Sequence, residues 1–495
     1  MYQVACPSCG AQVAFRSAAS VMAVCEYCRS TLLKDADSVK DIGKMSSVIE
    51  DFSPIQITSS GSWQGKRFGV VGRIQLRYDA GLWNEWYLLF DDGSAGWLSD
   101  ASGQYVFTVP AGSPPQAPAF EQIKPGATLN YDNTRFTAAD VRSARCVAGE
   151  GELPFRVGDG YTARVADFRA QQRFLTLDYS DSETPIVYAG EAVTLVGLQC
   201  QLLRSPEQIV QTAGRYRGKT QALDCPSCGS PLNYQAGMAT HLLCPSCHAE
   251  VDCGEDRATV LKKHDELEAV KTTLALGDEA KIDGSAWTLI GLMRCREFAS
   301  DGNSSWTEYL LFNTQAGFLW LVESDEGWER VEVLNSWPDE ISQTGVRFDG
   351  AGYTKLWEYG SEVVYAAGAF NWRVSIGDRT MIVDYRQGEV KLSQGRDEHE
   401  ITWSRAGKVT PAQIAQWFGK TPPPARQDFT DAAADIVPLK GTAKAFTWLL
   451  LILNLPMIFG SGLGGLVLLG LALLALWWPV WNYGKAGSGD GGDDD

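Results

Sequence analysis

Residues 83–93 read Trp-Asn-Glu-Trp-Tyr-Leu-Leu-Phe-Asp-Asp-Gly, and this stretch decides the fold of the region around it. Its first eight residues are mostly aromatic or aliphatic, as in a β-strand, and Asp-Asp-Gly is a hairpin-turn signal. The segments at 68–78 and 174–179 have a similar composition. We therefore predict a mainly β domain over residues 45–215, of the small barrel or sandwich type.

The same signature returns later in the chain, which indicates an internal repeat. Trp83-x-Glu85-Trp86 matches Trp306-x-Glu308-Tyr309, and Gly72 matches Gly291. Asp167-Phe168-Arg169 matches Asp384-Tyr385-Arg386, in the same order and with small gaps. A second copy of the β-rich domain is therefore predicted over residues 277–420.

Eight of the 12 cysteines form two sets, one ahead of each copy, and each set has two Cys-x-x-Cys pairs separated by fifteen residues. The sets are Cys6, Cys9, Cys25 and Cys28 within 1–34, and Cys225, Cys228, Cys244 and Cys247 within 221–255. Four thiolates at this spacing are typical of a closed tetrahedral zinc site. We predict two zinc ribbons, each holding one structural zinc ion.

Disulfides and redox-active Cys-x-x-Cys pairs are the alternatives to zinc. Disulfides are not expected because the first six residues, Met-Tyr-Gln-Val-Ala-Cys, carry no secretion-signal pattern. A thioredoxin-like motif would need only one pair, placed before a helix. His241, His248 and Cys253 lie close to the second set and are alternative ligands, although four cysteines already fill the site.

The net charge of −17 is distributed unevenly. Residues 1–220 have a net charge of −2, whereas residues 221–440 have a net charge of −13. Phosphate binding needs clustered cations, and residues 221–255 contain four acidic groups and no Lys or Arg. Nucleic acid is therefore not an expected partner, and the acidic second copy is expected to dock a protein partner through its field.

Forty residues between Lys444 and Lys485 contain no charged side chain. As one helix they would be about 60 Å long against a hydrocarbon core of about 30 Å, so two spans fit better. We predict a transmembrane hairpin over 441–484 with both ends cytoplasmic. One kinked span with an interfacial segment is the alternative, and it would export the acidic tail at 485–495.

The remaining segments are connectors. The stretch 256–276 is predicted as a helix that links the second ribbon to its domain, and shorter helices are predicted at 204–214 and 411–418. Pro422-Pro423-Pro424 opens a linker over residues 421–440.

Two pairs, Trp83 with Glu85 and Trp306 with Glu308, are the candidate ligand-binding residues. A carboxylate beside an indole is what a cation site would use, whereas the alternative places the tryptophans in the core or rim of a small barrel and the Glu on its solvent face. No nucleotide-binding, metalloprotease or nucleophile-elbow motif is present, and residues 1–240 contain no His. We therefore expect a protein that is not an enzyme.

Cys-Pro-Ser-Cys at 6–9, Val-Val-Gly-Arg-Ile at 70–74 and Trp-Asn-Glu-Trp-Tyr-Leu-Leu-Phe at 83–90 resemble a bacterial domain-of-unknown-function family. The resemblance covers about 1–440. It implies duplicated domains, zinc ribbons and a C-terminal membrane anchor, and a context of membrane-stress and polyamine-synthesis genes. It implies no catalytic residues.

Three functional hypotheses follow. The first is a cytoplasm-facing adaptor or scaffold anchored in the bacterial inner membrane, acting in envelope or membrane-stress processes. The second is a sensor that binds a cationic small molecule such as a polyamine through the acidic, Trp-rich second copy. The third is an enzyme of envelope metabolism, for which the sequence offers only unpaired cysteines and carboxylates.

Overall fold

The fold comes from a computed structural model of the chain. It describes residues 2–420 except 17–19, 29, 36–37, 45–47, 49–50, 80, 113–116, 159, 213–222, 233–240, 253–258, 263–271 and 299–303, and beyond these it describes Thr447 and Leu473. The chain divides into two units, Met1–Lys420 and Thr421–Asp495. All elements described below belong to the first unit.

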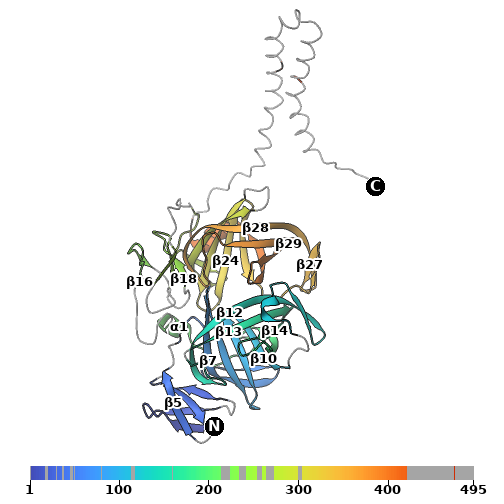
Figure 1. The fold of residues 1–495 in the computed structure, drawn as a ribbon. Helices are drawn as coiled ribbons and strands as arrows, with labels where there is room; N and C mark the ends of the chain where they lie inside the picture. The colour runs from blue at the N-terminus through green and yellow to red at the C-terminus, as the bar shows by residue number, and fades with distance from the viewer. Residues whose placement is uncertain are drawn as a thin grey trace, which may run out of the picture. The chain divides into compact units, whose positions relative to one another are not determined.

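The first β-rich domain is an antiparallel barrel of eight strands, drawn in blue to green in Figure 1. Its strands are β7 (Lys66–Tyr78), β8 (Gly81–Phe90), β9 (Ala95–Ala101), β10 (Gln104–Ala111), β12 (Thr134–Leu153), β13 (Tyr161–Ala170), β14 (Arg173–Asp178) and β15 (Ile186–Val193). Around the wall the order is β7-β8-β9-β10-β15-β14-β13-β12, and β12 pairs back onto β7 to close the barrel. The predicted turn at residues 91–93 joins β8 to β9, as expected.

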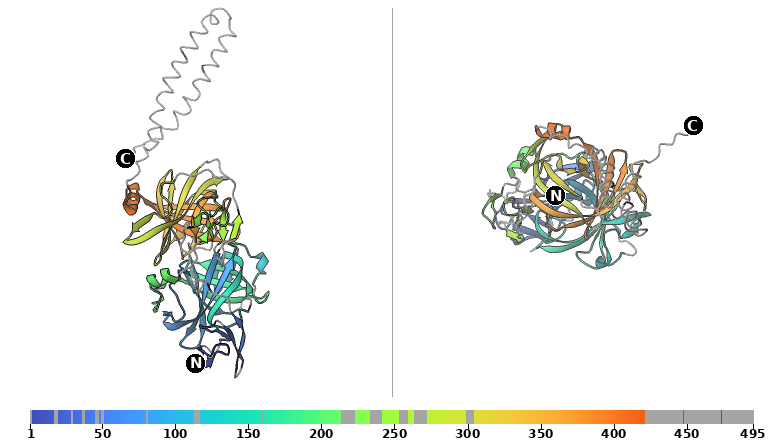
Figure 2. Two further views of the ribbon diagram at one scale, coloured as in Figure 1. Left: turned by 90° about the vertical axis from the view of Figure 1, so that its left-hand side faces the viewer. Right: turned by 90° about the horizontal axis from the view of Figure 1, so that it is seen from above.

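The second domain repeats this topology, in yellow to orange in Figures 1 and 2. Its strands are β22 (Ser285–Phe298), β23 (Ser305–Asn313), β24 (Gly317–Ser324), β25 (Gly327–Val333), β28 (Ala351–Phe370), β29 (Arg379–Gln387), β30 (Val390–Arg396) and β31 (Ile401–Val409). Strand β28 closes the wall against β22. The prediction of two mainly β copies is confirmed, and each copy is an eight-stranded barrel.

Short strands extend both barrels. They are β6 (Ser60–Trp63), which pairs with β7, β11 (Thr128–Tyr131), which pairs with β12, β21 (Glu279–Ile282), which pairs with β22, and β26 (Glu340–Ile341) with β27 (Gly345–Phe348), which adjoin β28.

The cysteine-rich segments are continuous with the barrels. The first contains β1 (Tyr2–Ala5), β2 (Gln12–Phe15), β3 (Met22–Val24), β4 (Ser30–Asp35) and β5 (Ser38–Lys44), and the second contains β16 (Leu223–Asp224), β17 (Pro231–Leu232), β18 (His241–Leu243), β19 (Glu250–Asp252) and β20 (Thr259–Lys262). Strand β3 pairs with the end of β12, and β18 pairs with the end of β28. Strands β3–β5 and β18–β20 therefore share a sheet with their barrels, whereas β1–β2 and β16–β17 form separate two-stranded sheets. The sequence had divided the cysteine-rich segments and the barrels into separate domains.

Glycines sit where each barrel closes. Gly72 on β7 is paired with Gly151 on β12, and a Cβ on Gly72 would lie 1.8 Å from the carbonyl oxygen of Glu152. Gly291 is paired with Gly368 in the same way in the second barrel. Gly151 and Gly368 have φ values of +69° and +90°, which favour glycine. The repeated glycine therefore marks the seam of each barrel.

Two of the three helix predictions are confirmed. Helices α1 (Pro206–Thr212) and α2 (Pro411–Phe418) begin at the prolines that predicted them, and a short 3-10 helix, η1 (Phe120–Gln122), lies between β10 and β11. The helix predicted at 256–276 is wrong where the structure describes it. Residues 259–262 form strand β20, because they pair with β19, and residues 272–276 have no helical structure.

The predicted hairpin over 441–484, its linker at 421–440 and the tail at 485–495 lie outside the described residues, apart from Thr447 and Leu473. Within the described part of the chain, no helix has the length and apolar character needed to cross a bilayer.

Candidate functional site

The structure brings together the four cysteines of each predicted set. The Sγ atoms of Cys6 and Cys28 are 3.5 Å apart, and those of Cys9 and Cys25 are 3.7 Å apart. The second set has two matching distances of 3.7 Å, Cys225 to Cys247 and Cys228 to Cys244. In a tetrahedral site with zinc–sulfur bonds of about 2.3 Å the sulfurs lie about 3.8 Å apart, whereas a disulfide is about 2.05 Å long. Each set could therefore hold one metal ion.

Tight turns present the cysteines to the cluster. The amide of Gly10 donates to the carbonyl of Cys6, and the amide of Gly229 donates to the carbonyl of Cys225, both at 2.8 Å. His248 takes the equivalent left-handed position after Cys247, with φ of 54°. The four cysteines of the second set already form a complete cluster without His248. Cys253 and the side chain of His241 lie outside what the structure describes.

One thiol in each cluster has a lowered pKa. Hydrogen bonds with Ser30 lower the pKa of Cys28 to about 6, and hydrogen bonds with Ser230 do the same for Cys228. The thiolate is the form of cysteine that binds a metal. The donor set and its spacing therefore fit a metal ion such as zinc, which would itself favour the thiolate form of the remaining cysteines.

The two Trp–Glu pairs have the same local geometry. The indole Nε1 of Trp83 donates to Oε1 of Glu85 at 2.8 Å, and that of Trp306 donates to Glu308 at 2.7 Å. Residues two apart on a strand share a face, which explains the contact. The carboxylate thus binds the edge of the indole rather than its face.

Glu85 faces the interior of the first barrel. Burial is the main cause that raises its pKa to about 7, and the charges of Asp167 and Asp178 contribute to this shift. These aspartates lie on β13 and β14, which do not adjoin β8 in the wall. Carboxylates on non-adjacent strands can interact in this way only across the inside of the barrel. We call this interior space the lumen.

The lumen of the first barrel combines acidic and aromatic side chains. The hydroxyl of Ser99 donates to Glu85 at 2.7 Å, and that of Thr176 donates to Asp167 at 2.7 Å. Burial raises the pKa of Tyr188 to about 12, with Asp178 and Glu85 contributing. The lumen therefore holds a carboxylate cluster beside phenol and indole rings.

Aromatic rings pack against each other in both barrels. Trp97 stacks on Phe155 with centroids 6.0 Å apart, and its repeat partner Trp320 lies 5.5 Å from Trp372. A connected cavity of about 2430 Å³ is lined by Trp83, Glu85 and Asp167 of one barrel, together with Glu308 and other lumen residues of the second. The acidic ends of the lumens are therefore open to a cavity large enough for a small molecule.

The second lumen contains its own cation. The Nζ atom of Lys391 lies 2.5 Å from Oε2 of Glu329 and 3.9 Å from Oδ2 of Asp384. Asp384 also accepts hydrogen bonds from Ser393 at 2.6 Å and Tyr359 at 3.3 Å. Burial raises the pKa of Glu308, and the charge of Lys391 opposes this shift. The second lumen thus has a lysine ammonium beside its carboxylates, although the strand order of the two barrels is the same.

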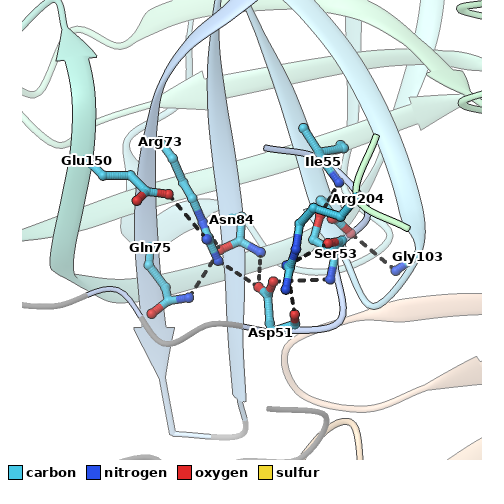
Figure 3. A network of polar contacts seen from close by, with 10 residues as sticks. Asp51, Ser53, Ile55, Arg73, Gln75, Asn84, Gly103, Glu150 and Arg204 are labelled. Atoms are coloured by element: carbon cyan, nitrogen blue, oxygen red, sulfur yellow. Dashed lines mark hydrogen bonds and ion pairs between the residues drawn. The ribbon is translucent and has the colours of Figure 1, made fainter. Parts of the chain in front are cut away.

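The outer face of the first barrel carries a second polar network (Figure 3). Arg73 is 2% exposed, lies 2.8 Å from Asp51 and 3.4 Å from Glu150, and donates to Asn84 at 2.9 Å. Asp100 lies next to this network, and its buried Oδ2 atom has no hydrogen-bond partner among the described residues. Because this network anchors the segment before β6 to the barrel wall, we assign it a structural role.

Several lumen residues escaped the sequence prediction. Asp167 and Asp384 appeared only as repeated residues, and Asp178, Glu329 and Lys391 were not selected at all. An available signal was the alternation of apolar and charged residues on strands flanked by turns. That pattern alone does not distinguish the inside of a barrel from the solvent face.

Two barrels, each fused to a four-cysteine cluster, define a tandem β-barrel protein with two candidate metal sites. The chain belongs to the family with the domain of unknown function DUF4178, whose model matches residues 56–195 and 275–411 and so covers more than half of the chain. The two matches coincide with the two barrels. No curated protein and no solved structure matches the chain.

Proposed function

We propose that this protein is a non-enzymatic binding protein that takes a small organic cation into the lumen of its first barrel. The observation that carries the proposal is the grouping of Glu85, Asp167 and Asp178 inside that lumen. Among the described residues, none of the three forms an ion pair with Lys or Arg. Enclosed carboxylates that form no ion pair are costly, and a bound cation offsets that cost.

The nearest arginines are engaged elsewhere. Burial raises the pKa of Asp167, and the charge of Arg169 opposes this shift. The guanidinium of Arg169 donates its hydrogen bond to the backbone carbonyl of Asn335, at 3.0 Å. Arg142 forms ion pairs with Asp140 and Glu400. The aromatic rings of the lumen add π faces that attract organic cations. These contacts support an amine rather than an anion as the ligand.

The contacts favour the first copy as the site of cation binding. The sequence hypothesis had selected the second copy. In the second lumen Lys391 already pairs with Glu329 and lies near Asp384. The strongly negative second copy is better suited to attract a basic protein partner by long-range steering. Such an adaptor role is the second candidate function, and it rests on the net charge of −13 over residues 221–440.

We propose zinc as the metal in both clusters and a structural role for it, because all ligands come from the protein and the sulfur spacing suits a tetrahedral ion. We also propose that residues 441–484 anchor the chain in the bacterial inner membrane, with the barrels in the cytoplasm. The uncharged run between Lys444 and Lys485 supports the anchor, and the flanking lysines support the orientation.

The binding proposal is tested by isothermal titration calorimetry on the full-length, zinc-loaded chain in detergent. We expect 1,4-diaminobutane to bind and neutral 1,4-butanediol not to bind. Glu85→Gln should weaken binding about tenfold, whereas the matched variant Glu308→Gln in the second barrel should not. The absence of diamine binding, or equal weakening by both variants, would overturn the proposal.

A further inference from the structure

We propose that Lys391 is a tethered ligand: its ammonium fills, in the second barrel, the site that the first barrel keeps open for a free primary amine. The inference deepens the proposed function and rests on it for the first barrel. It assigns different tasks to two barrels of the same fold, one binding a ligand and one occupied by its own side chain.

The two sites correspond at one carboxylate and one hydroxyl, whereas the position of Glu329 is taken by Val106 in the first barrel. Asp384 and Ser393 are directly paired across β29 and β30, as Asp167 and Thr176 are across β13 and β14. In both barrels the hydroxyl donates to the carboxylate, at 2.6 and 2.7 Å. The two Asp–hydroxyl pairs therefore occupy the same position in the barrel wall. A lysine ammonium lies beside this position in the second barrel and not in the first.

Lys391 precedes Ser393 by two residues and so faces the same lumen. Its side chain is 20% exposed, and its ammonium lies between Glu329 at 2.5 Å and Asp384 at 3.9 Å. Carboxylates on two strands thus surround the ammonium, and Tyr359 donates to one of them. These groups are the ones expected around a bound alkylammonium.

In the first barrel the corresponding residue is Phe174, which precedes Thr176 by two. The guanidinium of Arg169 lies over the Phe174 ring, 4.9 Å from its centroid. Phenylalanine supplies no charge, so Asp167 lacks the ammonium that its counterpart has. The lumen of the first barrel therefore has carboxylates and the Arg169 guanidinium, but no lysine ammonium beside Asp167.

The lysine also indicates the chemical class of the ligand. A lysine side chain beyond Cβ has the shape of n-propylammonium, an unbranched primary amine. The first lumen has three carboxylates, including Glu85 and Asp178, so a second ammonium on the same chain would have its own partner. The ligand class is therefore an aliphatic primary amine, with a diamine favoured over a monoamine.

Chemical rescue tests the tethered ligand. Lys391→Ala in the full-length, zinc-loaded chain removes the ammonium and leaves a space the size of n-propylamine. We expect its melting temperature to fall and n-propylamine to restore at least half of the loss. Neutral n-propanol should not restore it, and Lys391→Met, which fills the space without charge, should not respond to the amine. Equal effects of amine and alcohol, or an equal response of wild type and Lys391→Ala to the amine, would overturn the inference.

Stoichiometry separates this inference from the proposed function. Calorimetry with 1,4-diaminobutane should find one site in wild type, two in Lys391→Ala, and none in Phe174→Lys, which brings an ammonium into the first lumen. One site in both wild type and Lys391→Ala would overturn the tethered ligand while the proposed function stands. No site in wild type, combined with amine rescue of Lys391→Ala, would overturn the proposed function and support the tethered ligand.

Discussion

The guanidinium of Arg142 in the first barrel donates a hydrogen bond to Glu400 in the second barrel, with 2.8 Å between Nη2 and Oε2. The same guanidinium lies over the ring of Tyr78, 4.2 Å from its centroid, and bonds to Asp140. Next to it, the amide of Val141 donates to the carbonyl of His399 at 3.0 Å. Side-chain and backbone contacts thus join residues that are 258 positions apart in the chain.

We expect Arg142 and Glu400 to be energetically coupled. A double-mutant cycle with Arg142→Ala and Glu400→Gln should give a coupling energy of about 1 to 2 kcal/mol, because the arginine is only 12% exposed. Hydrogen exchange at the Val141 amide measures it locally. Lys66 and Asp92 form the matched control, since they are 2.9 Å apart but 61% and 50% exposed. Equal coupling in the two pairs would show that Arg142 contributes no more than a surface contact.

The seam glycines should be intolerant of alanine. A Cβ on Gly72 would lie 1.8 Å from the Glu152 carbonyl oxygen, so Gly72→Ala must displace backbone and should cost about 3 kcal/mol or more. A Cβ on Gly69 of the same strand would meet no described atom within 4 Å, and Gly69→Ala should be nearly neutral. Thermal denaturation compares the two variants. Similar melting temperatures would show that the barrel can open at Gly72 without loss.

Metal removal should loosen the barrel seam as well as the cysteine cluster. Cys25→Ser should reduce bound zinc from two equivalents per chain to one, because the cluster loses a ligand. It should also speed hydrogen exchange at Leu153, which pairs with Met22 of the first cysteine-rich segment. Cys200→Ser is the control, since Cys200 belongs to neither cluster. Two zinc equivalents in Cys25→Ser, by metal analysis, would contradict the assignment.

Amine binding should strengthen as the pH rises. The pKa of Glu85 is raised to about 7 from its ordinary value of 4.5, so the empty first lumen holds this carboxyl largely protonated at pH 5. An ammonium ligand favours the ionised form and therefore releases a proton near pH 7. Affinity should increase between pH 5 and 8 and then level off. Calorimetry in buffers of different ionisation enthalpy measures the proton release, which Glu85→Gln should reduce.

Glu85 also makes folding pH-dependent in the absence of ligand. In the unfolded chain it loses its proton near 4.5, whereas in the folded chain it does so near 7. The folded state therefore binds more protons between these values, and its stability falls as the pH rises through them. Urea denaturation measures the free energy of unfolding of Glu85→Gln and of wild type at pH 4 and pH 8. The difference between variant and wild type should favour the variant more at pH 8. The same difference at both values would show that the Glu85 carboxyl is not enclosed.

Local features were predictable from the sequence. The eight cysteines selected by their spacing lie in two clusters of four. The Asp91 to Gly93 turn and the proline-initiated helices follow from short-range chemistry. The stretch 256–276 was misassigned because a short strand there gains its hydrogen bonds from β19, a partner that propensity does not consider.

The sequence by itself determined that this chain has two copies of one plan, each preceded by four cysteines set for a metal ion. These features depend on spacing along the chain. Only the tertiary structure decided that Glu85 meets Asp167 and Asp178, and that Lys391 lies beside Asp384. Those contacts depend on closure of the wall, which turns one face of every strand toward a common interior. Long-range strand pairing decides whether a charged residue on a strand faces water or that interior. The local sequence pattern does not indicate which of the two it is.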